Sequence, residues 1–259
     1  MSALLEVVGV SKRFGGVQAV KDVSFSVLPG TIKAVIGPNG AGKTTLFNLV
    51  SGAVALDEGR ILFKGARTDG RPMHEVAARG MSRTFQHIRL FSGMTALENV
   101  MVGCHVRSRA GFLAGMLHLP STRREERQVC RRALEAMDLV GVARLASADA
   151  MSLSYGQQRG VELARALAAG PEMLLLDEPA AGLNMRETAE LAALISRIRD
   201  RGVTVLVVEH DMALVMSISD EVVVLSNGEV IADAEPSAVQ ANPDVVRVYL
   251  GEDEDAEAA

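Results

Sequence analysis

Three runs of apolar residues stand out along the chain, and each is followed at once by polar residues. The runs occupy residues 32–36, 173–176 and 203–208. The polar residues that follow them are Gly37, Asp177 with Glu178, and Glu209 with His210. Near-continuous apolar character is what a strand covered on both faces requires, so the runs predict buried parallel strands. Because ligands collect at the carboxyl ends of such strands, we expect these polar residues to share one site.

Two other stretches have a different pattern. An antiparallel layer beside the parallel core is predicted by short segments between Gly-containing turns, at 5–10, 22–27 and 60–63. Residues 87–157 are mostly helical in pattern, with helices expected at 96–103 and 121–138. This part interrupts the strands of the sheet, so we expect it to form a separate helical lobe.

The chain therefore divides into three predicted parts. The core is expected to combine residues 1–86 and 158–250, and the lobe to cover residues 87–157. The residues after Leu250 are a run of like charges, which predicts a disordered acidic tail over 251–259.

Composition narrows the class of protein. The 259 residues are 48% hydrophobic, which suits a substantial core, and carry a formal net charge of −5 at pH 7. A slightly acidic chain lacks the basic field that neutralises nucleic-acid phosphates. Aromatic residues make up only 3% and Trp is absent, which leaves no stacking platform for single-stranded bases. We therefore expect no nucleic acid partner.

The location of the chain can also be predicted. No apolar run approaches the roughly 18 residues that a bilayer span needs. The first residues lack the basic start of a signal peptide and reach an acid at Glu6. We expect a cytoplasmic chain that is at most peripheral to a membrane.

A glycine-rich loop follows the first apolar run. Its residues fit the pattern G-x-x-x-x-G-K-[ST] and are Gly37, Pro38, Asn39, Gly40, Ala41, Gly42, Lys43 and Thr44. The glycines let successive backbone N–H groups turn inward around phosphate oxygens. Lys43 would reach the β- and γ-phosphates of a nucleotide, and the Thr44 hydroxyl would bind Mg²⁺. The preceding strand and the helix expected after Thr44 complete the context of a phosphate-binding loop.

Two adjacent acids end the second apolar run. Strand alternation makes Asp177 and Glu178 point to opposite sides, so we expect them to have different roles. Asp177 suits a hold on Mg²⁺, and Glu178 suits the activation of an attacking water. Two acids at the end of a strand are a weak pattern alone, and they gain meaning from the phosphate loop.

A second phosphate-facing surface is predicted before this strand. Residues 153–159 open a helix that carries Val161, Ala164, Leu167 and Ala168 on one face. Ser154 and Gly156 then supply a hydroxyl and bare backbone at the positive end of the helix dipole. An ordinary helix N-cap is the commoner role of such a serine.

The segment Leu153-Ser154-Tyr155-Gly156-Gln157 resembles the signature motif of the ATP-binding cassette (ABC) ATPases, and the resemblance extends over residues 4 to 250. Gln86 matches the glutamine loop of that family and His210 its switch histidine. Phe14 stands where the family places an aromatic residue that stacks on adenine. By themselves these three residues suit a surface amide, a structural histidine and a core aromatic, and their order relative to the phosphate loop favours the family.

The resemblance implies a fold class, cofactors and site residues. The fold is an α/β P-loop NTPase core with a mostly parallel sheet, an N-terminal antiparallel layer and an inserted helical lobe. The implied catalytic residues are Glu178, His210 and Gln86, and the implied Mg²⁺ ligands are Thr44, Gln86 and Asp177. ATP would contact Phe14 and the loop residues 37–44 together with Thr45. Two chains would meet head to tail, so that Ser154 and Gly156 of one contact the γ-phosphate held by Lys43 of the other.

A narrower resemblance comes from residues 87–100, 107–126, 180–184 and 209–212. They look like those of the larger ATPase subunit of bacterial branched-chain amino acid importers. Sister importers of urea, amides or other amino acids share much of this pattern, and a lipopolysaccharide-export ATPase is related. One departure from the wider family is Asn184, where an Asp is usual; the subgroup shares this Asn.

Several partners follow from this resemblance. They are a second ATPase subunit, either a paralogue or this chain itself, two transmembrane permease subunits and, indirectly, a solute-binding protein. The chain would lie on the inner face of the cell membrane. The apolar segment 111–117 suits either the core of the lobe or a contact with the membrane partner.

Two other classes remain as alternatives. A soluble ABC ATPase that acts on nucleic acid or ribosomes usually needs a long coiled-coil insertion or a second cassette, and the chain has one phosphate loop and no sustained heptads. A P-loop kinase should lack the segment 153–159.

Overall fold

The computed structural model describes residues 2–86, 88–104 and 120–256. It divides into two compact units, the first made of Met1–Val76 with Leu175–Ala259 and the second of Ala77–Leu174. The second unit is larger than the lobe we predicted over 87–157. The reason is visible in its core, where Val161, Ala164 and Ala168 of the helix after the signature segment pack among residues of the lobe.

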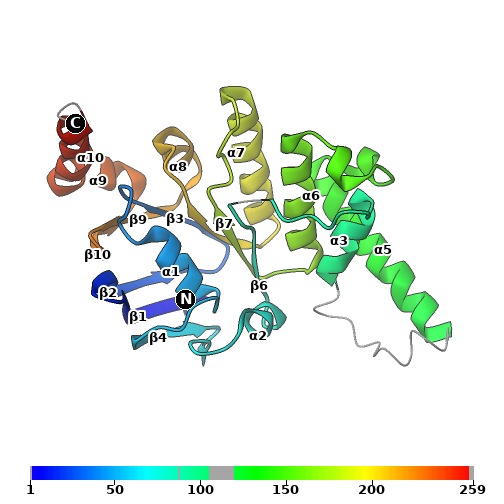
Figure 1. The fold of residues 1–259 in the computed structure, drawn as a ribbon, viewed down its shortest axis with the longest axis horizontal. Helices are drawn as coiled ribbons and strands as arrows, with labels where there is room; N and C mark the ends of the chain where they lie inside the picture. The colour runs from blue at the N-terminus through cyan, green and yellow to red at the C-terminus, as the bar shows by residue number, and fades with distance from the viewer. Residues whose placement is uncertain (1, 87, 105–119, 257–259) are drawn as a thin grey trace. The chain divides into compact units, whose positions relative to one another are not determined.

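The first sheet of the first unit has four strands in the order β2-β1-β4-β5 (Figure 1). Their bounds are Leu5–Phe14 (β1), Val17–Val27 (β2), Glu58–Phe63 (β4) and Ala66–Arg67 (β5). Strand β1 pairs antiparallel with both β2 and β4, placing Leu5 opposite Val27 and Phe63. The antiparallel layer predicted from the N-terminal segments is thus confirmed, with longer first and second strands than expected.

The second sheet carries the predicted central strands. Within the first unit its order is β10-β9-β3-β8-β7, with bounds Glu229–Ala234 (β10), Glu221–Ser226 (β9), Ile32–Ile36 (β3), Thr204–Val208 (β8) and Met173–Asp177 (β7), the last beginning in the second unit. Strand β3 runs parallel to β8 and to β9. Every residue of β3, β7 and β8 is buried, as expected for continuous apolar strands covered on both faces.

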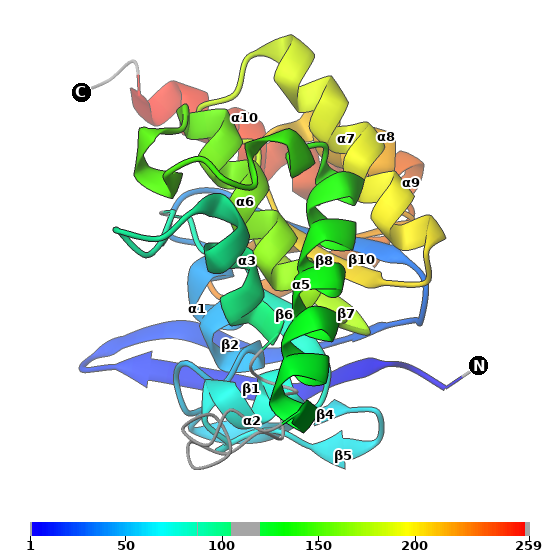
Figure 2. The same cartoon turned by 90° about the vertical axis from the view of Figure 1, so that its right-hand side faces the viewer.

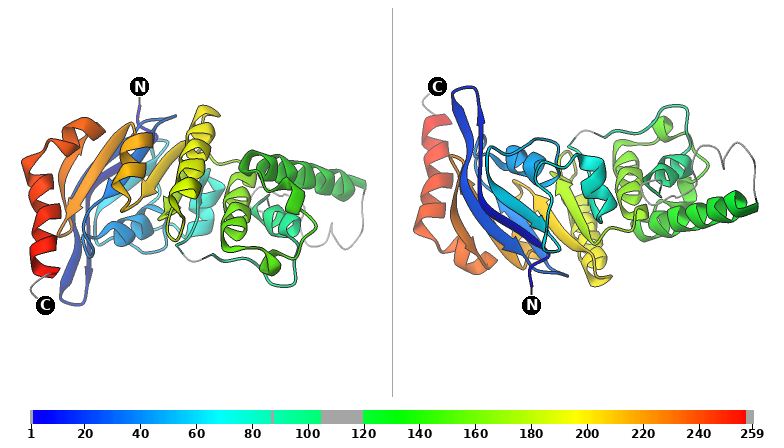
Figure 3. Two further views of the ribbon diagram at one scale, coloured as in Figure 1. Left: turned by 90° about the horizontal axis from the view of Figure 1, so that it is seen from above. Right: turned by 90° about the horizontal axis from the view of Figure 1, so that it is seen from below.

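Helices cover this sheet. They are α1 (Lys43–Val50), α7 (Met185–Asp200), α8 (Met212–Ile218), α9 (Pro236–Gln240) and α10 (Pro243–Ala256). Helices α1 and α7 both contact β8. Helices α9 and α10 lie beside β10, among the orange and red elements of Figure 3. Helix α2 (Met73–Ala78) follows the first sheet and continues into the second unit.

The acidic end of the chain corrects one prediction. We expected disorder over 251–259, but α10 continues through Ala256. The helix already holds Val245 in a buried position, and extending an established helix through good helix formers such as Glu and Ala costs little.

The second unit is built on three helices that pack together, as Figure 2 shows. Its elements are β6 (Met81–Arg83), α3 (Ala96–Cys104), α5 (Pro120–Val140), η2 (Ala143–Leu145), η3 (Ala150–Ser152) and α6 (Tyr155–Ala168). Val100, Met137 and Val161 bring apolar side chains from α3, α5 and α6 into one core. Strand β6 lies beside the start of β7, because the carbonyl of Gly80 accepts hydrogen bonds from the N–H groups of Glu172 and Met173.

The predicted insertion at 111–117 lies outside the described residues. Among the residues that are described, no helix combines the length and the apolar character that crossing a membrane demands.

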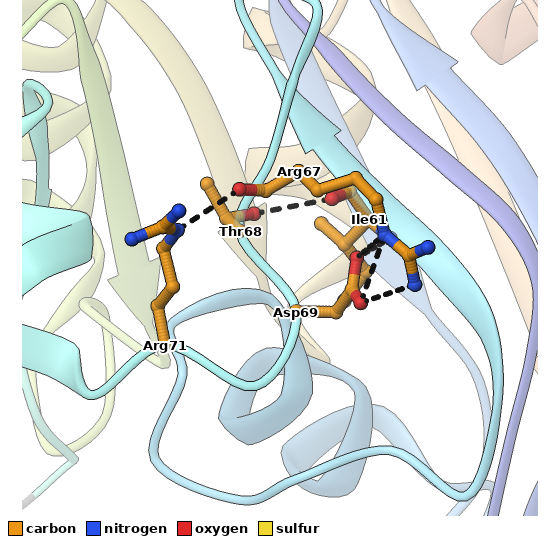
Figure 4. Close-up of polar contacts among 5 residues, drawn as sticks. All are labelled: Ile61, Arg67, Thr68, Asp69 and Arg71. Atoms are coloured by element: carbon orange, nitrogen blue, oxygen red, sulfur yellow. Dashed lines mark hydrogen bonds and ion pairs between the residues drawn. The ribbon is translucent and has the colours of Figure 1, made fainter.

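A local polar cluster fixes the turn after β5. The Asp69 carboxylate accepts hydrogen bonds from the Arg67 guanidinium, at 2.7 Å to its terminal nitrogen, and from the Ile61 N–H at 3.0 Å (Figure 4). The guanidinium of Arg71 in turn donates to the carbonyl oxygen of Arg67 at 3.2 Å. The Asp69 side chain is only 10% exposed, so the cluster ties this turn to strand β4.

Candidate functional site

The glycine-rich loop joins β3 to α1. Gly37, Gly40 and Gly42 all have positive φ angles, of 149°, 81° and 101°. A Cβ atom on Gly37 would lie 2.1 Å from the carbonyl oxygen of Leu225, and one on Gly42 would lie 2.3 Å from that of Ala19. The loop therefore needs glycine both for its backbone conformation and for its close contact with the neighbouring strands. Such a loop presents successive N–H groups to an anion.

Lys43 begins helix α1 and folds back over this loop. Its ammonium group donates hydrogen bonds to the carbonyl oxygens of Gly37 at 2.5 Å and Pro38 at 2.8 Å, and the residue is 8% exposed. Thr44, the next residue of the helix, is exposed. The buried ammonium group of Lys43 thus lies against the loop at the N-terminus of a helix, and these donors fit the phosphates of a nucleotide.

The carboxyl ends of three strands are joined by backbone hydrogen bonds. The N–H of Glu178, just after β7, donates to the carbonyl of Val208 at the end of β8. Strands β3 and β8 are parallel neighbours, and the N–H of Glu209 points to the carbonyl of Val35 in β3. The structure therefore brings the residues that follow the three apolar runs to one edge of the sheet, as the sequence predicts.

Strand alternation is the wrong reason for assigning different roles to Asp177 and Glu178. Asp177 is the last residue of β7 and is buried, but Glu178 lies beyond the strand with a positive φ of 46°. Strand alternation does not apply to a residue in the left-handed region, so the direction of Glu178 is set by its own backbone and by its bond to Val208.

His210 and Glu209 follow β8. The His210 side chain is 65% exposed, whereas that of Glu209 has no exposed surface. The Glu209 carboxylate accepts hydrogen bonds from the N–H of Ala180 at 2.7 Å and of His210 at 3.1 Å. From the sequence, Glu209 was expected only as a polar residue at a strand end, with no role of its own. The signal that could have pointed to Glu209 is its place directly after the five residues of β8, which are all buried.

Asn184 begins helix α7. Its side-chain oxygen accepts hydrogen bonds from the N–H groups of Arg186 and Glu187, and its own N–H donates to the Glu187 carboxylate at 2.9 Å. Asn and Asp serve equally well at this position of a helix. The departure from the usual Asp therefore preserves the start of the helix.

Phe14 lies at the end of β1 with 49% of its surface exposed. The Lys12 ammonium is 5.4 Å from the centre of its ring. Asp57 accepts hydrogen bonds from Lys12 at 2.6 Å and from the Arg13 N–H at 2.7 Å, and the Lys12 bond holds the pKa of Asp57 below its ordinary value. The aromatic ring is thus held on an ordered turn with much of it accessible.

The predicted signature residues lie in the second unit. Leu153 is the C-cap of η3, Ser154 is the N-cap of α6, and Tyr155, Gly156 and Gln157 form the first turn of α6. Ser154, Tyr155 and Gly156 are exposed. The Gln157 side chain accepts a hydrogen bond from the Ser154 N–H at 3.0 Å. The N-terminus of α6 is therefore ordered and accessible.

Gln86 also lies in the second unit, where α6 holds its backbone. Arg159 donates to the Gln86 carbonyl oxygen at 3.3 Å. One and two turns further on, Glu162 accepts from the Arg89 N–H at 3.4 Å and Arg165 donates to the Arg89 carbonyl at 2.5 Å. Burial raises the pKa of Glu162, and the charge of Arg165 offsets part of that effect. This link between α6 and the segment after Gln86 was not predicted from the sequence.

Comparison with known proteins gives the class. A family model described as "ABC transporter" matches residues 20–181, well over half of the chain. The chain therefore belongs to the ABC transporter family and is an ATPase of that family, as its motifs predicted. A second model, described as "Branched-chain amino acid ATP-binding cassette transporter", matches residues 229–255.

Individual relatives narrow the class further. The chain is 46% identical over 250 residues to the high-affinity branched-chain amino acid transport ATP-binding protein BraF of Pseudomonas aeruginosa, covering 96% of this chain and 98% of that protein. Among solved structures, the ADP conformation of an ATP-binding cassette of an ABC transporter has a TM-score of 0.84 at 31% identity, covering 97% and 100% of the two chains. A dimeric ATP-binding cassette bound to ADP and Pi in a post-hydrolysis state has a TM-score of 0.76 at 26% identity, covering 90% and 98%.

Proposed function

We propose that this chain is the ATP-hydrolysing subunit of a membrane importer for branched-chain amino acids. The observation that carries the proposal is the 46% identity to BraF, which spans 96% of this chain and 98% of that protein. The family match at 229–255 adds support, because these residues lie beyond the phosphate loop and the strand-end acids that many nucleotide-binding proteins share.

The nucleotide would be held by residues of the first unit. Gly37, Gly40 and Gly42 shape the loop whose N–H groups surround the phosphates, and Lys43 supplies the positive charge. In this proposal Lys43 exchanges its hydrogen bonds with Gly37 and Pro38 for bonds to phosphate oxygens. Phe14 would stack on adenine, which its accessible ring supports.

Mg²⁺ is the second proposed cofactor. Thr44 and Asp177 offer a hydroxyl and a carboxylate oxygen, which are ligand types that Mg²⁺ prefers. Gln86 stays a predicted third ligand. When bound together with ATP, the ion would neutralise charge that develops on the phosphates.

Hydrolysis would depend on Glu178 and His210. Glu178 is the proposed general base that activates the attacking water, and His210 the proposed switch residue beside the γ-phosphate. The hydrogen bonds that join the ends of β3, β7 and β8 support this assignment, because they fix both residues at the edge of the sheet where the phosphate loop begins.

The complete site is proposed to form between two ATPase subunits. Ser154 and Gly156 would face the γ-phosphate bound by Lys43 of the other subunit, so that ATP closes the pair and hydrolysis opens it. The dimeric ADP- and Pi-bound cassette that resembles this chain supports such a pairing. The second subunit is a paralogue or another copy of this chain.

The pair would act on two permease subunits at the cytoplasmic face of the membrane and respond through them to a solute-binding protein. The experiment is to purify the transporter complex through a tag on this chain and to measure ATP hydrolysis with binding protein loaded with different solutes. Stimulation by binding protein carrying leucine, isoleucine or valine is expected. Stimulation only by urea-loaded or amide-loaded binding protein would favour the sister importers.

A further inference from the structure

Glu209 is a carboxylate with no exposed surface at the carboxyl end of β8. Burial raises the pKa of this residue, since the charged form loses its hydration. A buried acid is costly unless hydrogen bonds satisfy both of its oxygens. The contacts of Glu209 therefore indicate what its presence achieves.

Two of its hydrogen bonds go to backbone N–H groups next to proposed catalytic residues. One oxygen accepts from Ala180, two residues after Glu178, and the other accepts from His210 itself. The first of these partners is 29 positions away along the chain and follows a different strand. The Glu209 carboxylate thus ties the segment after β7 to the segment after β8.

A second link lies alongside. The N–H of Glu178 donates to Val208, the residue just before Glu209. Each side of the turn at Glu178 is therefore anchored to the end of β8, by a backbone bond before the turn and by the Glu209 side chain after it. The Glu209 carboxylate also lies 3.8 Å from Nδ1 of His210, which is beyond hydrogen-bond distance but within reach of a charge interaction when the imidazole is protonated.

We propose that Glu209 is a positioning residue for ATP hydrolysis, whose carboxylate holds Glu178 and His210 in the relative arrangement that the chemical step requires. The inference rests on the proposed roles of these two residues and adds a third that does not touch the nucleotide. A positioning role affects kcat and not ATP affinity, because the phosphate loop that binds ATP makes none of the hydrogen bonds described for this carboxylate. Loss of Glu209 should lower kcat and leave ATP affinity nearly unchanged.

Two substitutions remove one or both of the acceptor oxygens of Glu209. Glu209→Gln keeps the size of the side chain and one acceptor oxygen, so one of the two N–H groups loses its partner. Glu209→Ala removes both acceptors. We expect kcat to fall by about 10- to 100-fold in Glu209→Ala, since a small misplacement of catalytic groups has effects of this order. Glu209→Gln should lie between Glu209→Ala and the wild type.

Thr204→Val is the matched control. Thr204 lies on the same strand, is 1% exposed and accepts a hydrogen bond from the Gly30 N–H at 2.9 Å, at the opposite end of β8. Loss of this hydrogen bond should lower the midpoint temperature of thermal unfolding without changing kcat. A general weakening of the sheet is thereby distinguished from the loss of positioning.

The experiment uses three measurements on the full chain and its transporter complex. Steady-state hydrolysis gives kcat and KM, a fluorescent ATP analogue gives nucleotide affinity, and hydrogen exchange reports on the N–H groups of Ala180 and His210. The expected result is faster exchange at these two positions, a lower kcat and an affinity within about twofold of wild type. Unchanged exchange at both positions in Glu209→Ala would overturn the inference, as would an equal loss of kcat in Thr204→Val.

The inference and the proposed function fail differently. If the wild-type complex hydrolyses ATP and Glu209→Ala retains its kcat, the positioning role is wrong and the function stands. If the wild-type complex hydrolyses no ATP, the proposed function fails and the positioning role fails with it.

Discussion

The guanidinium of Arg165 donates a hydrogen bond to the carbonyl oxygen of Arg89 at 2.5 Å. It also lies 3.5 Å from the Glu162 carboxylate, which accepts from the N–H of the same Arg89. One residue of the segment after Gln86 is therefore held at both its N–H and its carbonyl group by two side chains one turn apart on α6. Within the second unit, helix α6, which begins at the signature residues, therefore holds the backbone of the segment after Gln86 in place.

The first prediction concerns this link. Arg165→Met keeps the apolar stem but removes the ion pair of the largely buried Glu162 with Arg165. We expect the free energy of unfolding to fall by about 1.5–3 kcal/mol, the contribution of hydrogen bonds that involve charged groups. Urea denaturation followed by circular dichroism measures the change. Arg186→Met is the control, because its pair with Glu190 is 88% and 65% exposed, and it should cost below about 0.5 kcal/mol. Similar losses in the two variants would contradict the prediction.

The second prediction concerns Lys43. Lys43→Ala should lower ATP affinity by about 10- to 100-fold, because one charge-assisted hydrogen bond contributes about 1.5–3 kcal/mol. Titration with a fluorescent ATP analogue measures the affinity, and far-ultraviolet circular dichroism checks that the variant is folded. Lys21→Ala removes an exposed lysine that pairs with Glu229 and should bind ATP as the wild type does. Wild-type affinity in Lys43→Ala would remove this residue from the proposed site.

Much of the fold could be predicted because its evidence is local. The apolar runs predict β3, β7 and β8 to within a residue at each end, and glycine spacing predicts the loop between β3 and α1. Features that depend on distant contacts could not be predicted. Helix α6 packs with α3 and α5, and nothing in its own pattern distinguishes those partners from the sheet.

Dependence on distant contacts also explains why the backbone of Glu178 and the position of Glu209 were not predicted. The left-handed turn at Glu178 depends on a bond to Val208, and the position of Glu209 depends on Ala180. A period of two predicts side-chain direction only while a strand continues, and β7 ends one residue too early for that argument.

The third prediction concerns Glu178. Glu178→Gln keeps size and hydrogen bonding but removes the basicity of the carboxylate, so hydrolysis should fall by about 100-fold or more while ATP binding persists. Bound ATP should then hold two subunits together, which light scattering detects as a larger species with ATP and not with ADP. If pairing needs a paralogue, that subunit is added first. Wild-type turnover of Glu178→Gln in the assembled complex would exclude Glu178 as the general base.

The fourth prediction concerns Ser154. This residue is exposed at the start of α6, so the longer side chain of Ser154→Arg fits the isolated chain. ATP binding should stay intact while hydrolysis is suppressed, because the obstruction arises only when two subunits close. Mixing with Lys43→Ala should restore part of the activity, since one of the two composite sites is then unmutated. Loss of ATP binding by Ser154→Arg alone would show that the serine acts within its own subunit.

The fifth prediction concerns the pH dependence of stability at Asp69 (Figure 4). The hydrogen bond from Arg67 holds the pKa of Asp69 below its ordinary value, outweighing the opposing effect of burial. The charged form is favoured in the folded state, so its contribution is complete above the ordinary carboxyl pKa and is lost as pH falls through the folded value. Asp69→Asn should therefore be destabilised most near neutral pH, with a difference from wild type that shrinks below about pH 4.

Urea denaturation at several pH values measures this difference. Glu75→Gln is the control, because the pair of Glu75 with Arg71 is exposed on both sides, and its effect should be small throughout. A difference between Asp69→Asn and wild type that stays constant down to pH 3 would contradict the assignment.

The left-handed backbone of Glu178 has a consequence for engineering this protein. A non-glycine residue in that region carries a strain on the order of 1 kcal/mol, which a glycine would relieve. Selection of variants for heat resistance alone would therefore reward Glu178→Gly, and with it the loss of the proposed catalytic carboxylate. A library screened without an activity assay would accumulate well-folded, inactive transporters, so the two properties have to be selected together.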